Sequence, residues 1–155
     1  MIKLELAING ETETVIVGAA QTLLDVLRTS LGFTGTKLGC NQGVCGSCTV
    51  LIDGKPARSC LVLAAGCRGR AITTIEGIAN GAAASAVQQA FIEAGAVQCG
   101  YCTPGMVLAA EALLQRNKKP SISEIRDALS GNLCRCSGYT KIIDAVNLAS
   151  ERVSS

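Results

Sequence analysis

The nine cysteines of this 155-residue chain constrain its fold more than any other feature, because eight of them fall into two spaced groups. The first group is Cys40-x4-Cys45-x2-Cys48 followed by Cys60, and the second is Cys99-x2-Cys102 followed by Cys134-x-Cys136. An odd number of cysteines argues against a disulfide framework, and residues two apart, such as Cys134 and Cys136, rarely reach disulfide geometry. The thiols are therefore expected to bind metal.

The first group has the spacing of plant-type ferredoxins, in which three thiolates on a tight loop and one from a neighbouring strand hold a [2Fe–2S] cluster. Gly39, Gly43 and Gly46 allow close backbone approach and positive φ, so that amide N–H groups can point at sulfur. A structural zinc site is the alternative, but zinc sites usually consist of two separated Cys-x2-4-Cys pairs. We therefore predict that one [2Fe–2S] cluster is bound by Cys40, Cys45, Cys48 and Cys60.

The second group taken alone fits either zinc or an iron–sulfur cluster. Its two pairs flank two predicted helices, so an antiparallel helical hairpin could bring all four thiols together. Its presence beside a plant-type site favours iron, with the ligands Cys99, Cys102, Cys134 and Cys136. The ninth cysteine, Cys67, fits neither pattern and is interpreted as a small buried hydrophobic residue.

The sequence contains no histidine, which excludes a Rieske centre, a Ser-His or Cys-His nucleophile and a histidine general base. No histidine-based catalytic residue is therefore expected in this chain. Lys and Arg total 14 against 12 for Asp and Glu, and the basic residues are scattered. This charge pattern does not indicate nucleic-acid binding.

The first 76 residues have the pattern of a small β-grasp module. Alternating residues from Ile2 to Ile8, the turn Asn9-Gly10 and a Thr/Val-rich run from Thr12 to Val17 predict a hairpin with a type I′ turn. A short amphipathic helix over Leu24–Leu31 and a cysteine loop over Gly35–Cys48 should follow. The chain then predicts a second hairpin over Cys48–Cys60, which turns at Asp53-Gly54, and a further strand over Ala71–Ile75. The sequence thus predicts residues 1–76 as one domain.

The second half should be all-helical. Residues 77–84 are rich in Gly and Ala and predict a connector, after which 85–155 form a second domain. Helices are expected over 86–94, 104–115, 122–129 and 141–151, and Ser121 with Glu124 predicts a capping box. Thr103 and Thr140 are the predicted N-caps of the second and fourth helices.

The chain is predicted to be cytoplasmic. Its first residues lack the basic, apolar and small-residue regions of a signal peptide. The longest apolar stretches, Leu61 to Cys67 and Met106 to Leu114, are far shorter than the ~18–20 residues of a membrane span, so no direct membrane insertion is expected. Export together with a partner that carries a signal would leave this sequence unchanged.

Three motifs identify a resemblance. They are Cys40-Asn41-Gln42-Gly43-Val44-Cys45-Gly46-Ser47-Cys48, then Gln98-Cys99-Gly100-Tyr101-Cys102-Thr103-Pro104-Gly105, then Asn132-Leu133-Cys134-Arg135-Cys136-Ser137-Gly138-Tyr139. In order and separation they resemble the small [2Fe–2S] iron–sulfur subunit of the xanthine oxidase family of molybdenum hydroxylases. The resemblance covers essentially the whole chain and all eight proposed ligands.

The resemblance implies an α+β fold, in which an N-terminal β-grasp ferredoxin-like domain precedes an all-α four-helix-bundle [2Fe–2S]-binding domain. It implies that electrons pass singly from molybdopterin on a large catalytic subunit, through the C-terminal and then the N-terminal cluster, to a flavin or another acceptor. By the same resemblance, Gln98 and Cys136 are the residues expected nearest the pterin, and the chain itself is expected to have no catalytic residue and no substrate site. The acceptor would lie on a FAD-binding medium subunit or on a cytochrome that carries haem.

Two other functions are compatible with the cysteine pattern. A double zinc-binding structural module would use the same thiols and would be colourless. A free-standing electron carrier similar to ferredoxin would be brown but would purify alone. Metal content and co-purification distinguish these alternatives from an electron-transfer subunit of an oxidoreductase complex.

Overall fold

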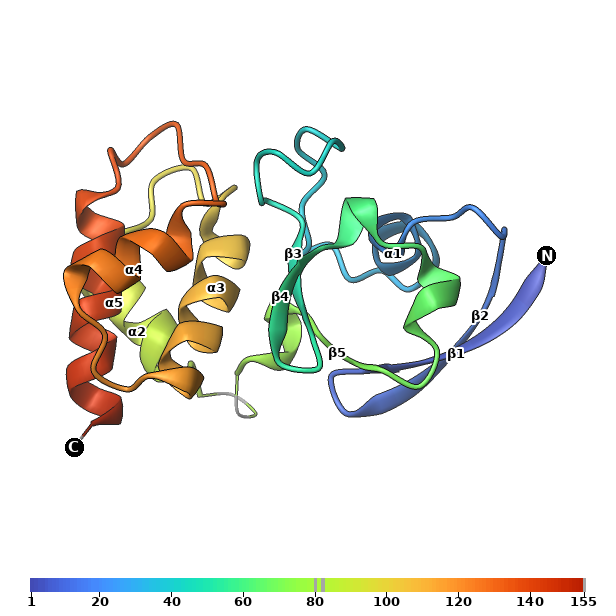
Figure 1. Ribbon diagram of the computed structural model, residues 1–155, viewed down its shortest axis with the longest axis horizontal. Helices are drawn as coiled ribbons and strands as arrows, with labels where there is room; N and C mark the ends of the chain where they lie inside the picture. The colour runs from blue at the N-terminus through green and yellow to red at the C-terminus, as the bar shows by residue number, and fades with distance from the viewer. Residues whose placement is uncertain (80, 82, 155) are drawn as a thin grey trace.

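In the computed structural model, which describes residues 1–79, 81 and 83–154, a half built on a β-sheet lies beside a helical half (Figure 1). The strand order of the sheet is β2-β1-β5-β3-β4. The strands are β1 (Ile2–Ile8), β2 (Glu11–Val17), β3 (Thr49–Ile52), β4 (Lys55–Arg58) and β5 (Ala71–Thr73). Only β1 and β5 pair in parallel, and the other three pairings among these strands are antiparallel. This mixed sheet confirms the predicted ferredoxin-like class of the N-terminal half.

The first hairpin forms as its alternating pattern predicts. Leu4, Leu6 and Ile8 of β1 are buried, and they pack with residues of the following helical segment in one hydrophobic core. Asn9 and Gly10 have φ values of +54° and +85°, which are the two positive values of a type I′ turn.

The second hairpin is shorter than predicted. β4 ends at Arg58, and Cys60 lies in a 3₁₀ turn, Ser59–Leu61, rather than on the strand. The carbonyl oxygen of Cys48 accepts two hydrogen bonds from Ser59, one from its hydroxyl at 2.7 Å and one from its backbone N–H at 3.3 Å. This double contact ends the ladder and turns Cys60 back towards Cys48.

The amphipathic segment after β2 is only partly α-helical. Thr22 caps α1 (Leu23–Asp25) through its side chain, but the chain continues as a π-helical turn, Val26–Ser30. The Thr29 hydroxyl donates to the Asp25 carbonyl at 2.6 Å, and such bonds to the preceding turn compete with regular helix bonds. A regular helix was predicted here, and that prediction was wrong for its second half.

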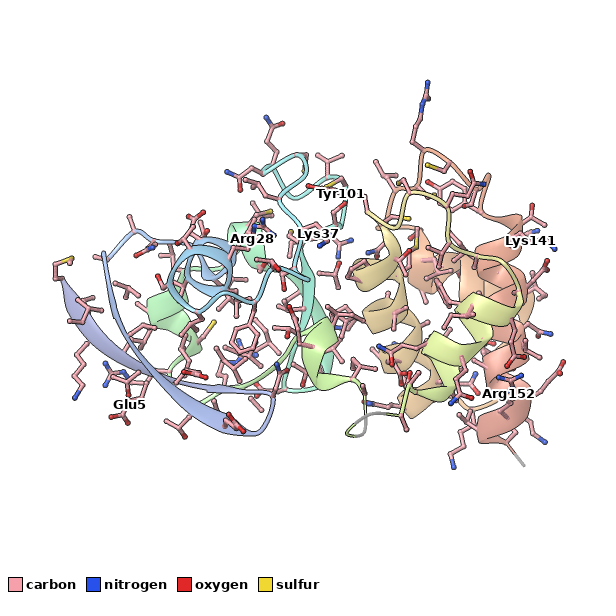
Figure 2. The ribbon with its side chains drawn as sticks, turned by 180° about the vertical axis from the view of Figure 1, so that it is seen from behind. Glu5, Arg28, Lys37, Tyr101, Lys141 and Arg152 are labelled. Atoms are coloured by element: carbon pink, nitrogen blue, oxygen red, sulfur yellow. The ribbon has the colours of Figure 1, made fainter. Side chains whose placement is uncertain are left out.

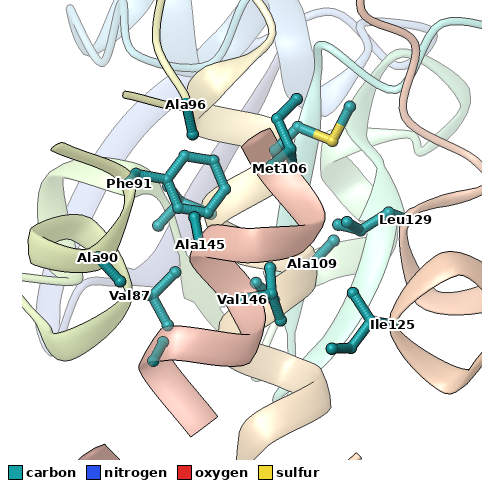
Figure 3. Packing of buried hydrophobic residues seen from close by; sticks show 14 of the residues in the cluster. Val87, Ala90, Phe91, Ala96, Met106, Ala109, Ile125, Leu129, Ala145 and Val146 are labelled. Carbon is teal, nitrogen blue, oxygen red and sulfur yellow. The ribbon is translucent and has the colours of Figure 1, made fainter. Parts of the chain in front are cut away.

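The helical half contains α2 (Ala86–Glu93), α3 (Thr103–Arg116), α4 (Ile122–Leu129) and α5 (Thr140–Val153), as the sequence predicted. Their apolar faces enclose a second core, which includes Phe91, Met106, Ile125 and Val146 (Figure 3). The four-helix class of the C-terminal half is therefore confirmed.

The helix starts differ from the predictions at two places. The capping box of Ser121 and Glu124 is present. Thr103 and Thr140, predicted as N-caps, are instead the first residues of α3 and α5. The N-cap of α3 is Cys102, which has no side-chain capping bond, so this cysteine loop runs directly into the helix.

The domain limits 1–76, 77–84 and 85–155 stay predictions. Of the predicted connector, residues 80 and 82 lie outside the described part of the chain. Within the described part, no helix is long and apolar enough to cross a bilayer.

Candidate metal centres

The first cysteine loop folds around the sulfur of Cys40. The backbone N–H groups of Gln42, Val44 and Cys45 donate to this sulfur, each at 3.3 Å. The N–H of Cys40 in turn donates to the sulfur of Cys45 at 3.4 Å. Gly43, with φ +77°, provides a left-handed residue in this loop, a conformation that other residues rarely adopt. The loop thus surrounds sulfur with donors that stabilise negative charge.

The thiols of the first group differ in acidity. Hydrogen bonds, first from the N–H of Cys45 and then from that of Gln42, lower the pKa of Cys40 to about 6. Cys48 and Cys60 are buried together in a small cluster. Burial and then the neighbouring Cys48 thiol raise the pKa of Cys60 to about 11. Cys60 therefore stays protonated at neutral pH unless a cation binds beside it.

The second group is assembled by two loops at one end of the helical half. Cys99 and Cys102 lie in the loop before α3, and Cys134 and Cys136 lie in the loop between α4 and α5 (Figure 1). The sulfurs of Cys99 and Cys136 are 3.5 Å apart. The predicted convergence of the two pairs is therefore present. The first cysteine loop lies at the same end of the molecule (Figure 1).

The second group also combines two kinds of thiol. Burial, followed by the neighbouring Cys134 thiol, raises the pKa of Cys102 to about 12. Burial also opposes ionisation of Cys134, but hydrogen bonds led by those from Ser137 outweigh it and lower its pKa to about 7. The hydroxyl of Ser137 donates to this sulfur at 3.2 Å and its N–H at 3.4 Å. Both groups can thus begin metal binding with a ready thiolate.

The spacing of the Cys99 and Cys136 sulfurs fits two thiolates on one metal. Two thiolates on one tetrahedral metal with bonds of about 2.3 Å lie about 3.8 Å apart, whereas a disulfide holds its sulfurs about 2.05 Å apart. The 3.5 Å between Cys99 and Cys136 is close to the first value, and all nine cysteines are free thiols.

A [2Fe–2S] cluster needs two thiolates on each of two irons. Among residues 1–79, 81 and 83–154, no three His, Cys, Asp or Glu side chains converge as they would around a single ion. The strongest interactions within each group join Cys99 to Cys136, Cys102 to Cys134, Cys40 to Cys45 and Cys48 to Cys60, and weaker ones link the pairs of a group. Pairs of thiols with N–H and hydroxyl donors on sulfur are a donor set that fits such clusters.

Backbone and side-chain contacts join the two groups. The N–H of Leu133, the residue bonded to Cys134, donates to the carbonyl of Cys45 at 2.8 Å. Tyr101 lies between the two halves (Figure 2), and its hydroxyl donates to the carbonyl of Leu38 at 2.5 Å. The sequence did not predict these contacts, since Tyr101 and Leu38 are 63 residues apart.

Gln98 lies at the rim of the second group. Its Nε2 donates to the carbonyl of Cys136 at 3.3 Å, and both residues are exposed. The sequence placed these two residues together at the predicted point of electron entry, and they are in contact. Their proximity to a pterin stays a prediction.

Cys67 is fully buried in the core of the sheet domain. Burial raises the pKa of its thiol, and its sulfur donates only weakly to the Leu63 carbonyl at 3.8 Å. The prediction of a small buried residue outside both groups is confirmed.

Two protein-family models match the chain. The model described as a 2Fe-2S iron-sulfur cluster binding domain matches residues 6–71, and the model described as a [2Fe-2S] binding domain matches residues 74–147. The chain therefore has two [2Fe–2S]-binding domains, in agreement with its two groups of cysteines.

Two known iron–sulfur subunits match this chain over nearly their whole length. The nicotinate dehydrogenase small FeS subunit of Eubacterium barkeri is 49% identical over 154 residues, which are 99% of this chain and 98% of the relative. The xanthine dehydrogenase iron-sulfur-binding subunit of Escherichia coli O157:H7 is 47% identical over 147 residues, which are 94% of this chain and 92% of the relative.

Solved structures have the same fold. The quinoline 2-oxidoreductase from Pseudomonas putida 86 matches with a TM-score of 0.95 at 46% identity, over 99% of this chain and 96% of the matched chain. The aldehyde oxidoreductase from Desulfovibrio desulfuricans matches with a TM-score of 0.96 at 39% identity, over 99% of this chain but 17% of that chain. The present fold is thus found both as a separate small chain and as part of a larger one.

Proposed function

Because this chain belongs to the family of small [2Fe–2S] iron–sulfur subunits of the xanthine oxidase-type molybdenum hydroxylases, we propose that it carries single electrons from the molybdopterin of a separate catalytic subunit to a flavin or another acceptor. Each cluster, when bound, takes up and releases one electron at a time. The protein supplies the thiolates, the hydrogen bonds to sulfur and the fixed separation of the two sites.

In this proposal the N-terminal cluster is held by Cys40, Cys45, Cys48 and Cys60, and the C-terminal cluster by Cys99, Cys102, Cys134 and Cys136. The observation that carries the electron-transfer role is the hydrogen bond from Leu133 to Cys45. Leu133 is bonded to Cys134, a proposed ligand of the C-terminal cluster, and its hydrogen-bond partner Cys45 is a proposed ligand of the N-terminal cluster.

The exposure of the second group supports the proposed direction of electron flow. Cys99 and Cys136 are exposed together with Gln98, so we place the molybdopterin donor at this edge. The Gln98 amide can bond a pterin without adding charge beside a negative cluster. The electron would then leave through the N-terminal cluster.

Exposed apolar side chains surround both groups, as expected for surfaces that partner subunits cover. They are Val97, Tyr101 and Leu133 beside the second group and Val44, Leu61 and Leu63 beside the first. We propose that a large molybdopterin-binding catalytic subunit covers the surface of Val97, Tyr101 and Leu133 beside the second cysteine group. A medium FAD-binding subunit or a cytochrome would cover the surface of Val44, Leu61 and Leu63 beside the first cysteine group. A cytoplasmic location fits eight thiols that must stay reduced for cluster assembly.

Purification of the affinity-tagged chain from its native host tests this proposal. The chain should co-purify with a molybdenum-containing subunit, and substrate of the complex should bleach the iron–sulfur absorbance. The variant Cys67→Ala is the matched control for cysteine loss, since Cys67 is buried away from both groups and should leave both clusters in place. A colourless zinc protein, or a brown protein that purifies alone, would contradict the proposal.

A further inference from the structure

The contact between the two halves contains a buried hydrogen-bond network centred on Thr49. The hydroxyl of Thr49 donates to the carbonyl of Gly46 at 2.6 Å. It accepts from Asn132 Nδ2 at 3.1 Å and from Arg58 Nη1 at 3.0 Å. Thr49 is 1% exposed and Asn132 3% exposed. Buried networks of this kind specify one arrangement, because leaving any member unpaired is costly.

Asn132 fixes the register between the two cysteine groups. Its Nδ2 donates to the carbonyl of Gly46 at 3.0 Å, while the next residue, Leu133, donates from its N–H to the carbonyl of Cys45 at 2.8 Å. Two consecutive residues of the helical half thus hold two consecutive carbonyls of the sheet half. Movement of one half relative to the other would break both bonds.

Glycines bring the two backbones into direct contact at this network. A side chain at Gly105 of α3 would place its Cβ 2.5 Å from the carbonyl oxygen of Gly46. A side chain at Gly46 would overlap the carbonyl oxygen of Gly131, and one at Gly131 would overlap the guanidinium of Arg58. Arg58 Nη2 donates to that same Gly131 carbonyl. Close packing therefore limits how far the halves can slide, and the network selects the position.

We propose that Asn132 is a positioning residue for electron transfer between the two clusters. The proposal rests on the proposed function and its ligand assignment. In the step concerned, one electron leaves the C-terminal cluster, which is oxidised, and enters the N-terminal cluster, which is reduced, without any change of bonds or protons. Asn132 takes no part in this redox change. It holds the Leu133–Cys45 bond at the length and angle on which the coupling of the two sites depends.

Two variants of Asn132 test the proposal in the purified complex. Asn132→Ala removes the side chain, and Asn132→Asp keeps its shape but replaces the donor to Gly46 with a second acceptor. Asn147→Ala is the matched control, because Asn147 donates from α5 to Glu151. The rate of electron exchange between the clusters is measured after rapid one-electron reduction. Iron content and the spin–spin interaction of the two reduced clusters are measured in the same samples.

We expect a severalfold slower exchange and an altered spin–spin interaction in both Asn132 variants, with iron content unchanged, and wild-type values in Asn147→Ala. An unchanged exchange rate with both clusters present would overturn the proposal. Loss of iron from the Asn132 variants would also overturn it and make the residue structural. Failure of the proposed function would be seen separately, as a wild-type complex without two [2Fe–2S] clusters.

Variants of Thr49 provide an independent readout. Thr49→Val removes the hydroxyl that joins Asn132 to Arg58 and should slow exchange as Asn132→Ala does. Thr49→Ser retains the hydroxyl and should restore the wild-type rate. If the valine and serine variants exchanged electrons equally fast, the network would have no role in positioning.

Discussion

Replacement of Gly46 with alanine tests how tightly the two halves are packed. Gly46 has φ +72°, and a Cβ there would lie 2.9 Å from Asn132 Cα and would overlap the Gly131 carbonyl. The left-handed conformation costs a non-glycine residue about 1–2 kcal/mol. Overpacking of a close contact costs about 1–3 kcal/mol more. We therefore expect Gly46→Ala to lower the free energy of unfolding by about 2–5 kcal/mol.

Gly54→Ala is the matched control for this change. Gly54 has φ +76°, and no atom lies within 4 Å of the position its Cβ would take. It should therefore lose only the conformational contribution of about 1–2 kcal/mol. Urea denaturation of the cluster-loaded chains, followed by far-ultraviolet circular dichroism, measures both losses. Equal losses in the two variants would show that Gly46 is not in tight contact with the helical half.

Three further predictions concern the cysteine loops. Ser137→Ala removes a hydroxyl donor to the Cys134 sulfur and should lower the reduction potential of the C-terminal cluster only, as measured by a redox titration; a shift of both potentials would contradict this. In the cluster-free chain, the alkylation rate should become half-maximal near pH 6 at Cys40, near pH 7 at Cys134 and near pH 12 at Cys102. The reason is that only a lowered pKa gives reactive thiolate at neutral pH. Mass spectrometry measures alkylation at each cysteine, and the same pH dependence at all three would contradict the prediction. Gln98→Ala should keep the iron content but slow the bleaching of the clusters by substrate in stopped flow, and an unchanged rate would remove Gln98 from the donor site.

Local sequence signals predicted the local structure well. Asn9-Gly10 specified its turn because both residues tolerate positive φ, and Ser121 with Glu124 specified the start of α4 through reciprocal capping bonds. The cysteine spacing predicted that the loop before α3 and the loop after α4 would meet, and the contact between the Cys99 and Cys136 sulfurs agrees with this. These features depend on residues that are close in sequence or that belong to a cysteine motif of known spacing.

The contact between the halves could not be predicted in the same way. Thr49 and Asn132 are 83 residues apart, and each alone has the appearance of an ordinary loop residue. The glycine pattern predicted close approach of the Gly46 backbone to sulfur, but the contacts of Gly46 with Gly131 and of Gly105 with Gly46 exist only when both halves are present. The π-helical turn after α1 was likewise not predicted, and it is accompanied by a hydroxyl bond from Thr29 to the Asp25 carbonyl that competes with regular helix bonds.

The central claim is that eight thiols hold two unlike [2Fe–2S] clusters, and electron paramagnetic resonance of the reduced complex tests it most directly. The donors to sulfur differ, since backbone N–H groups surround Cys40 whereas a hydroxyl reaches Cys134. We therefore expect about four irons and about four acid-labile sulfides per chain and two distinct signals. Cys45→Ser should disturb one signal and Cys102→Ser the other. Stoichiometric zinc in a colourless protein, or a substitution that disturbs both signals alike, would contradict the account.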